Sequence, residues 1–341
     1  MKMNILLTSA GRRSYIVKYF QEALNGEGLV HAANSQYSPA LEAADRYVIT
    51  PLIYDKNYIQ FLLDYSLSNN INAVTSLFDV DLPILAKAKS EFAKHNIHVI
   101  VSDYEVTQIC NDKWSTYTFL TKYGFNFPRT YLSIDDFSCD VDQGVIEFPV
   151  IIKPRWGCGS IGIYVAENKQ ELQVLYNKVN NEILRTYLKY ESFQDIKQAV
   201  IIQQMLVGKE YGLDIINDLN KNYITTLVKH KLAMRSGETD IAITEDNKVL
   251  RELGRKISAN VGHIANLDVD CFMVDEVPYI LEMNCRFGGG YPFSHIAGAN
   301  LPLAIIKWIK SEKIPRELFE IKYNVKGVKD ISPVILKNLL E

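Results

Sequence analysis

The chain has 341 residues, of which 48% are hydrophobic and 23% are charged, and its net charge is −3 at pH 7. These values are typical of a folded globular protein with room for two or three domains. They argue against nucleic-acid binding, and no apolar run reaches the roughly 18 residues that a membrane span requires. The five cysteines lack CxxC spacing and the apolar start is too short for a signal peptide, so we expect a protein of the reducing cytoplasm.

The N-terminal part alternates short apolar runs with helical patterns. Strand-like runs occupy residues 4–8, 29–33, 73–77 and 98–101, and helical spacing occurs at 15–24, 58–67 and 82–95. This alternation predicts a parallel sheet that is covered on both faces. The loop after the first strand feeds a helix N-terminus, but it lacks GxGxxG, so we do not expect a dinucleotide there. Arg12, Arg13 and Asp79 could hold a substrate or could be capping and surface charges.

A glycine-rich loop follows an apolar strand in the middle of the chain. The strand covers residues 148–154 and carries Lys153, and the loop contains Gly157, Gly159 and Gly162. Such a loop can bring backbone N–H groups against phosphate oxygens, to which the lysine adds a point charge. It is not a Walker A loop, because no GK[ST] follows the glycines. Glycines are also common in ordinary tight turns, so this pattern alone is a weak indication.

Further helices and strands are predicted on both sides of this loop. Helices are expected at residues 113–123, with Asp112 as the cap, and at 169–190, 246–261 and 300–309. Two strands within 199–216 join at Val207-Gly208, and a third covers 223–232. Residues 233–240 read as a polar loop that could close over a site.

An acidic hairpin is the most informative stretch. Two alternating strands, 267–274 and 280–284, flank a turn at 275–278. A pivot near the middle of this turn places Asp270 opposite Glu282 and Asp268 opposite Asn284, with Cβ atoms about 4.5–5.5 Å apart. Carboxylate and amide oxygens at this spacing suit Mg²⁺ or Mn²⁺. The alternative is an acidic patch on a solvated face of a sheet.

Taken in order, these segments resemble the ATP-grasp superfamily over nearly the whole chain. Within it, the blocks at residues 8–15, 235–240 and 286–292 are similar to the carbamoyl-phosphate-synthase-large-subunit-like group of single-unit ligases. The resemblance implies an α/β chain that is α+β in its ATP-binding part. It implies a Rossmann-like pre-ATP-grasp domain at residues 1–103, an ATP-grasp domain at 104–310 with a small lobe near 120–205 and a large lobe near 206–310, and a peripheral tail at 311–341.

The resemblance also implies roles for individual residues. For nucleotide binding these are Lys113, Lys153, Gly157, Gly159, Ser160, Gly162, Gln204, Met205, Leu206, Glu210 and Lys231. Two Mg²⁺ (or Mn²⁺) ions that bridge ATP would be held by Asp270, Glu282 and Asn284, and the catalytic charges would come from Arg286, Lys153 and Arg235. This sequence departs from the family in three places: Asp270 and Gln204 stand where glutamate is common, and Cys285 stands where proline is common.

These roles imply a ligase that activates a carboxylate as an acyl phosphate and joins it to an amine, giving ADP and phosphate. Its partners would be a small-molecule carboxylate and amine, with no nucleic acid and no membrane, and a second copy of the chain is a further candidate because relatives are commonly dimers. A phosphotransferase that releases a phosphorylated product and a nucleotide-binding module without turnover are the alternatives. The sequence names neither substrate and leaves open whether Asp268 joins the metal site.

Overall fold

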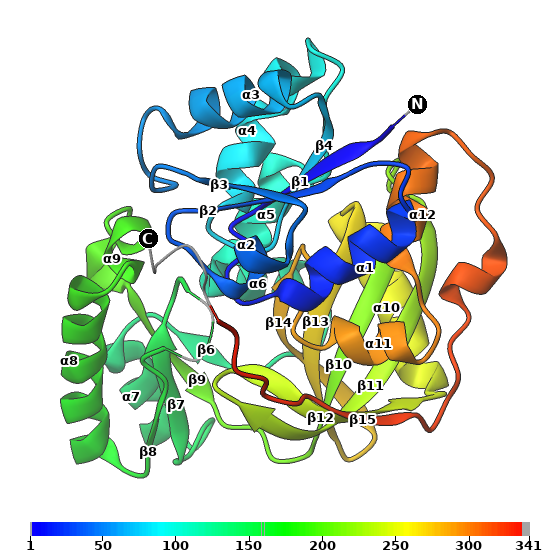
Figure 1. Cartoon of the computed structure of the whole chain (residues 1–341). Coiled ribbons are helices and arrows are strands. Elements are labelled where there is room, and N and C mark those ends of the chain that lie inside the picture. Colours follow the sequence, from blue (N-terminus) through cyan, green and yellow to red (C-terminus); the bar gives the residue numbers. More distant parts are fainter. Residues whose placement is uncertain (1, 158, 160, 336–341) are drawn as a thin grey trace.

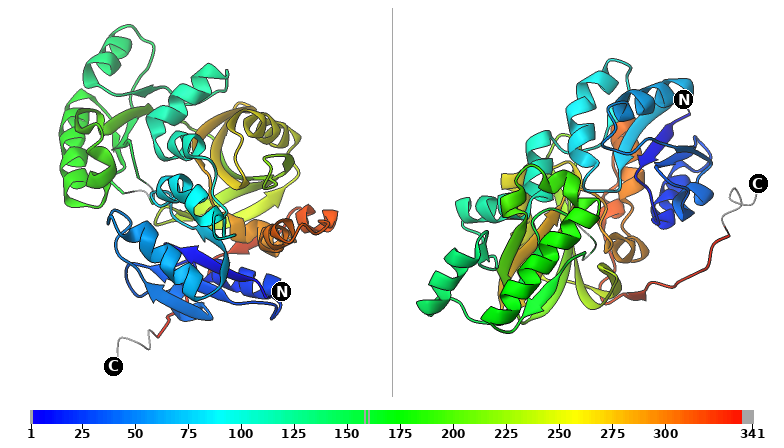
Figure 2. Two further views of the ribbon diagram at one scale, coloured as in Figure 1. Left: turned by 90° about the horizontal axis from the view of Figure 1, so that it is seen from above. Right: turned by 90° about the vertical axis from the view of Figure 1, so that its left-hand side faces the viewer.

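The structure is a computed structural model that describes residues 2–157, 159 and 161–335. Within these residues the strands form three sheets, one parallel and two antiparallel (Figure 1). The parallel sheet lies in the blue and cyan part and the four-stranded sheet in the green part, while the six-stranded sheet runs from yellow-green to orange, with its edge strand in red (Figures 1 and 2). No helix in the described ranges is long and apolar enough to span a bilayer.

The parallel sheet is covered by helices on both faces, as predicted. Its strands are β1 Asn4–Thr8, β2 Val30–Asn34, β3 Arg46–Ile49, β4 Ile71–Ser76 and β5 His98–Val99, in the order β3-β2-β1-β4-β5. The helices that follow are α1 Ser14–Leu24, α2 Pro39–Ala43, α3 Tyr58–Ser68 and α4 Leu82–Ala93. Because side chains alternate along a strand, Leu6 packs in the core that contains α3 and α4, whereas Ile5 and Leu7 pack in the core that contains α1.

The four-stranded sheet carries the glycine-rich loop. Its strands are β6 Thr130–Tyr131, β7 Val150–Pro154, β8 Tyr164–Ala166 and β9 Val200–Gln204, in the order β6-β9-β7-β8. The helices α7 Ile134–Asp142, α8 Lys169–Arg185 and α9 Leu188–Ser192 pack in the core of this sheet, and the 3₁₀ turn η1 Ile196–Gln198 precedes β9. The helices α5 Tyr104–Asn111 and α6 Lys113–Lys122 come before this sheet in the chain and pack in the core that contains α3 and α4. Asp112 caps α6 as predicted, since its Oδ1 accepts from the Trp114 N–H at 2.9 Å. The single helix predicted over 169–190 is wrong, because Thr186 is extended and ends α8.

The six-stranded sheet carries the acidic hairpin. Its strands are β10 Lys209–Asn217, β11 Tyr223–Arg235, β12 Glu238–Glu245, β13 Ala265–Val274, β14 Val277–Asn284 and β15 Lys326–Val328, in the order β14-β13-β10-β11-β12-β15. The helical elements are α10 Lys248–Val261, α11 Tyr291–Ile296, α12 Leu301–Ile309 and the 3₁₀ turn η2 Arg316–Phe319. The helix α10 lies against the sheet, with Leu250 and Ile257 in the same core as Leu213 and Val269.

One expectation for this sheet is corrected, and the tail after residue 310 contributes one edge strand. The polar loop predicted at 233–240 is wrong: β11 runs to Arg235, β12 starts at Glu238, and only Ser236 and Gly237 form the tip, both with positive φ. These strands have one exposed face, which tolerates polar residues, and the resulting polar sequence resembles that of a loop. Within the tail expected to be peripheral, residues 326–328 form β15, which pairs with residues 241–243 of β12.

The parallel sheet provides a test of the packing. We expect Leu6→Ala to lower the free energy of unfolding by about 2–5 kcal/mol, because the fully buried side chain leaves a cavity between β1 and the helices. Leu67→Ala is the control, because this leucine of α3 is 45% exposed and its loss should change little. Urea denaturation of both variants measures the difference, and equal losses would contradict the assigned core.

Candidate active site

The β13–β14 hairpin has the predicted register. Asp268 pairs with Asn284 and Asp270 pairs with Glu282 across two antiparallel strands. Since residues two apart on a strand share a face, all four side chains lie on the same face of the sheet. The turn is tighter than predicted, because pairing extends to Val274 and Val277, with only Asp275 and Glu276 between them.

A buried lysine joins this hairpin to the adjacent strands. Lys231 of β11 donates from Nζ to Asp270 Oδ1 at 2.6 Å and to Glu210 Oε1 of β10 at 2.9 Å. Burial tends to lower the pKa of Lys231, but the carboxylates of Asp270 and Glu210 outweigh it and hold the pKa above its usual value. The lysine therefore stays charged and connects the residue expected at the ribose to a residue expected at the metal.

Arg286 is the best anchored of the predicted catalytic residues. Its Nε and Nη2 donate to Asp79 Oδ2 at 2.9 and 2.8 Å, and its Nη1 lies 3.5 Å from Asp268 Oδ2. Each of the three side chains is about nine-tenths buried. Burial and the neighbouring Asp270 raise the pKa of Asp268 to about 7, against the effect of Arg286. Asp268 therefore faces Arg286. Asp79 belongs to the site as the main acceptor of Arg286, whereas the sequence had left open whether it was a surface or capping charge.

Lys153 faces the acidic hairpin from the other antiparallel sheet. Its Nζ donates to Gln203 Oε1 at 2.7 Å, and the residue is 5% exposed. Burial and the charge of Lys113 lower its pKa to about 8, although Glu282 and Asp270 act in the opposite direction. The structure thus brings both predicted phosphate-binding lysines into one electrostatic field with two predicted metal ligands.

The glycine-rich loop adopts backbone conformations that glycine favours. Gly157, Gly159 and Gly162 have φ of +117°, +71° and +68°. A Cβ at Gly157 would lie 2.5 Å from Leu188 Cδ2. Ser160, which belongs to the predicted phosphate-binding set, lies outside the described residues. The main-chain freedom that a phosphate-binding loop needs is therefore present at the three described glycines.

Two contacts fix the start of this loop. The Arg155 guanidinium donates from Nε and Nη2 to the two carboxylate oxygens of Asp112, both at 2.7 Å. The Lys113 Nζ donates to the Gly157 carbonyl at 2.6 Å. The N-terminus of α6 and the strand end after β7 are thereby held together.

The expected adenine-binding segment lies at the end of β9. Gln204 is its last residue, and its side-chain oxygen accepts from the Arg129 N–H at 3.2 Å. Met205 is 39% exposed and Leu206 is half-buried. These three residues lead into β10, where Glu210 contacts Lys231, so the segment is contiguous with the charged site.

The structure places Arg235 elsewhere. Its guanidinium pairs with Asp240 and donates to the Lys329 carbonyl at 2.8 Å. These contacts tie it to its own hairpin and to the C-terminal segment. The described contacts therefore do not bring Arg235 together with Lys113 and Lys153, and a role on phosphates stays a prediction.

Sequence reasoning missed a buried polar network beneath the site. Asp214 of β10 pairs with Lys229 of β11, accepts from Ser294 Oγ at 2.5 Å and accepts from Asn266 Nδ2 at 3.2 Å. Asn266 Nδ2 also donates to the Arg286 carbonyl at 3.1 Å. Asp214 stands between two apolar residues and Lys229 follows Val228, but their pairing depends on strand order, which no local pattern contains.

The donor atoms of the hairpin fit a divalent cation. Among the described residues, no three His, Cys, Asp or Glu side chains converge in the manner of a metal site. The facing pair Asp270 and Glu282, with Asn284 on the same face, nevertheless offers only oxygens, which Mg²⁺ prefers. The repulsion by which Asp270 raises the pKa of Asp268 is the kind that a bound cation relieves. These residues could therefore hold Mg²⁺.

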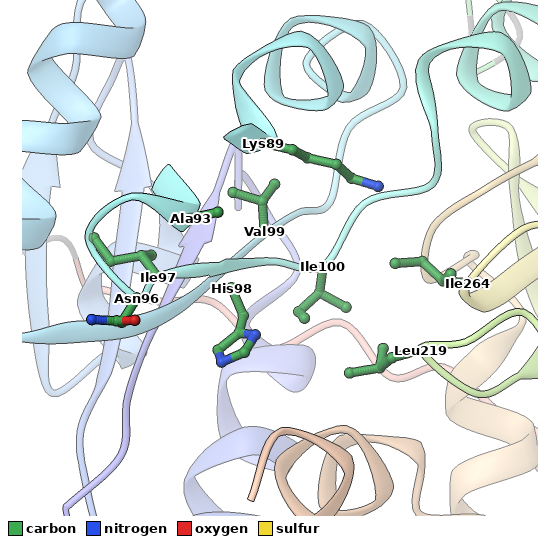
Figure 3. A pocket seen from close by; sticks show the side chains of 9 residues that line it. All are labelled: Lys89, Ala93, Asn96, Ile97, His98, Val99, Ile100, Leu219 and Ile264. Atoms are coloured by element: carbon green, nitrogen blue, oxygen red, sulfur yellow. The ribbon is translucent and has the colours of Figure 1, made fainter. Parts of the chain in front are cut away.

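One cavity lies apart from all of these residues. It has a volume of about 370 Å³ and is lined by Lys89, Ala93, residues 96–100, Leu219 and Ile264 (Figure 3). Figure 3 shows side chains from α4, β5 and the β10–β11 turn pointing toward it. None of the predicted site residues lines this cavity, so it gives no support to them.

Two family models match successive parts of the chain. The model for the PylC-like N-terminal domain matches residues 5–100, and the ATP-grasp domain model matches residues 110–290. A carbamoyl-phosphate synthase from Methanobrevibacter smithii is 24% identical over 303 residues, covering 84% of this chain and 75% of that protein. The chain spans 20% or less of several larger curated relatives.

Two solved structures share the fold. The biotin carboxylase domain dimer of Hydrogenobacter thermophilus 2-oxoglutarate carboxylase, in complex with MgADP, ADP and bicarbonate, matches with a TM-score of 0.71, 15% identity and coverage of 95% of this chain and 73% of that one. The L-amino acid ligase from Bacillus licheniformis matches with a TM-score of 0.68, 19% identity and coverage of 90% and 75%. At these identities the likeness shows the fold alone.

The lowered pKa of Lys153 predicts a pH dependence of nucleotide binding. Its proton is lost in the free protein as the pH rises through about 8, and bound phosphates favour the charged form. The affinity for MgADP should therefore fall above pH 8, by up to about tenfold per pH unit. Calorimetric titrations across this range test it, with Lys153→Arg as the control that stays charged. Identical pH profiles for the two proteins would contradict the assignment.

The anchoring of Arg286 predicts a large effect of its partner. Asp79→Ala removes the main acceptor of a buried guanidinium and should lower the free energy of unfolding by about 3 kcal/mol. Glu252→Ala is the control, because it removes an equally short pair with Arg255 on the exposed face of α10, which should cost nothing measurable. Equal denaturation midpoints for the two variants would show that the Asp79 contact is not structural.

Proposed function

Because the chain belongs to the ATP-grasp domain family, we propose that it is an ATP-dependent ligase that joins a carboxylate to an amine. The family model covers more than half of the chain. The observation that carries the proposal is the facing pair Asp270 and Glu282 on one face of the sheet, with the Lys231 ammonium 2.6 Å from Asp270. Cations for phosphate oxygens and oxygen ligands for a divalent ion also face each other across the two antiparallel sheets.

The first step would transfer the γ-phosphoryl group of ATP to a substrate carboxylate. A carboxylate oxygen attacks the γ-phosphorus, the bond from this phosphorus to the β–γ bridging oxygen breaks, and ADP leaves. The transferred group carries negative charge on three oxygens, so catalysis needs cations and in-line positioning. Lys153 is suited to this role because it is held by Gln203 and remains charged below about pH 8.

The second step would form the amide. The amine attacks the acyl carbon, the carbon–oxygen bond to phosphate breaks, and the proton lost by the amine nitrogen passes to the released phosphate. Negative charge develops on the carbonyl oxygen, and Arg286, which the structure fixes beside Asp268 and Asp79, is the cation proposed to stabilise it. Its two carboxylate partners hold the guanidinium in place, so little reorganisation is needed as charge develops.

Divalent cations and domain roles complete the proposal. Asp270, Glu282 and Asn284 would hold Mg²⁺, which when bound would neutralise the terminal phosphates of ATP; two ions are proposed by resemblance. The biotin carboxylase relative in complex with MgADP supports this ligand pair. We assign residues 104–310 to nucleotide binding and residues 1–103 to the acceptor side, to which Arg13 and Asp79 belong.

The proposal predicts that nucleotide turnover depends on two substrates. Phosphate release should require both a carboxylate and an amine in a pairwise screen with MgATP, and the product should be an amide with ADP. Arg286→Lys should reduce turnover by about a hundredfold or more, because lysine cannot keep the same fork of hydrogen bonds. The control is Arg255→Lys on α10, which should match the wild type. Turnover without any amine, or a stable phosphorylated product, would contradict a ligase.

A further inference from the structure

Three distant segments of the chain meet beside Arg286. Arg13 lies in the loop after β1, Glu238 begins β12, and Lys329 follows β15. The Lys329 Nζ donates to Glu238 Oε2 at 2.9 Å, and Arg13 Nη2 lies 3.7 Å from Glu238 Oε1. We call these three residues, together with Tyr15, the charged cage. Lys329 reaches this position because β15 adds an edge strand to the six-stranded sheet.

The charged cage adjoins the proposed reaction centre through the turn after β14. The Phe287 carbonyl accepts from Arg13 Nη1 at 2.7 Å and from Arg286 Nη1 at 3.2 Å, so both guanidinium groups share one acceptor. A Cβ on Gly289 would lie 3.3 Å from the Glu238 side chain, which shows how closely the turn packs against it. A ligand group in the cage would therefore be near Arg286.

The cage contains an unused polar group. The Tyr15 hydroxyl oxygen is buried and has no hydrogen-bond partner, and Lys329 Nζ lies 5.7 Å from the centre of the Tyr15 ring. Burial raises the pKa of Tyr15 above its usual value, so the hydroxyl keeps its proton. A buried hydroxyl without a partner costs about 1–3 kcal/mol, a cost that a bound polar ligand would remove.

Glu238 is ionised in this setting. Burial tends to raise its pKa, but Lys329 and Arg13 outweigh burial and hold the pKa below its usual value. The cage therefore presents one carboxylate between two cations. A simple carboxylate would be repelled by Glu238 and a simple amine by Arg13 and Lys329. A molecule with both charges can replace the internal pair, since its ammonium can bind Glu238 while its carboxylate binds Lys329.

We propose that the charged cage of Arg13, Tyr15, Glu238 and Lys329 recognises the ammonium and carboxylate of a free amino acid, which is one of the two substrates of the ligase. This inference rests on the proposed function and specifies its substrate class. Glu238 and Lys329 are the specificity-determining residues, and Tyr15 donates its hydroxyl to the amino acid carboxylate. Arg13 holds the loop against Leu77 and Phe287 while its other nitrogen faces the cage.

The test measures binding of single amino acids to the full chain with MgADP present. Calorimetry with each of the twenty common amino acids should find at least one that binds, and its analogues without the amino group or without the carboxylate should bind about tenfold more weakly or less well. Glu238→Gln and Lys329→Met should weaken binding of the amino acid by about tenfold or more. Lys326→Met, on the exposed face of the same β15 strand, should leave it unchanged.

Tyr15→Phe distinguishes a loss of ligand binding from a loss of folding, because it removes only a hydroxyl that has no partner in the protein. It should weaken binding about fivefold without lowering the melting temperature. The proposal is overturned if no amino acid binds, if either analogue binds as well as the amino acid, or if the cage variants bind like the wild type. If the protein turns over other carboxylates and amines, and Glu238→Gln does not change this turnover, the amino acid site is contradicted but the ligase activity is not. Cage-dependent binding without any ADP release would overturn the ligase instead.

Discussion

A buried guanidinium joins the two halves of the molecule, and the site depends on it. Arg286 follows the hairpin of the six-stranded sheet, yet its strongest partner, Asp79, follows a strand of the parallel sheet. An arginine at this depth is stable only when its hydrogen bonds are satisfied. The pair therefore fixes how the two sheets dock. It also fixes the guanidinium beside Asp268, at the place where the proposed chemistry needs a cation that does not move.

The remaining charges are arranged by strand order. Four neighbouring strands, β11, β10, β13 and β14, present Lys231, Glu210, Asp270 and Glu282, so that one cation stands at the end of a row of three carboxylates. Lys153 approaches from a second sheet with its pKa lowered by burial. Such a surface has cations for phosphate oxygens on one side and oxygen ligands for a metal on the other, which is what phosphoryl transfer from ATP requires.

Local sequence patterns predicted several features correctly, although the patterns at residues 169–190 and 233–240 were misread. Alternation around a short turn was enough for the pairing of Asp270 with Glu282, and one aspartate before a helical pattern was enough for the cap at Asp112. Contacts between distant strands could not be predicted, because the spacing of apolar residues within a segment does not determine the order of the strands in a sheet. Asp214 beneath Arg286, the junction of Asp79 with Arg286 and the edge strand β15 all belong to this class. The nucleotide roles of the individual residues stay predictions.

The central claim is that ATP activates a carboxylate by phosphorylating it. The most direct measurement follows oxygen: the carboxylate found in the substrate screen is labelled with ¹⁸O, and the released inorganic phosphate is analysed by mass spectrometry after turnover with the amine. An acyl phosphate carries one carboxylate oxygen between carbon and phosphorus, and this oxygen leaves with phosphate when the amide forms. The account predicts phosphate with one ¹⁸O atom per amide formed. Unlabelled phosphate would contradict it.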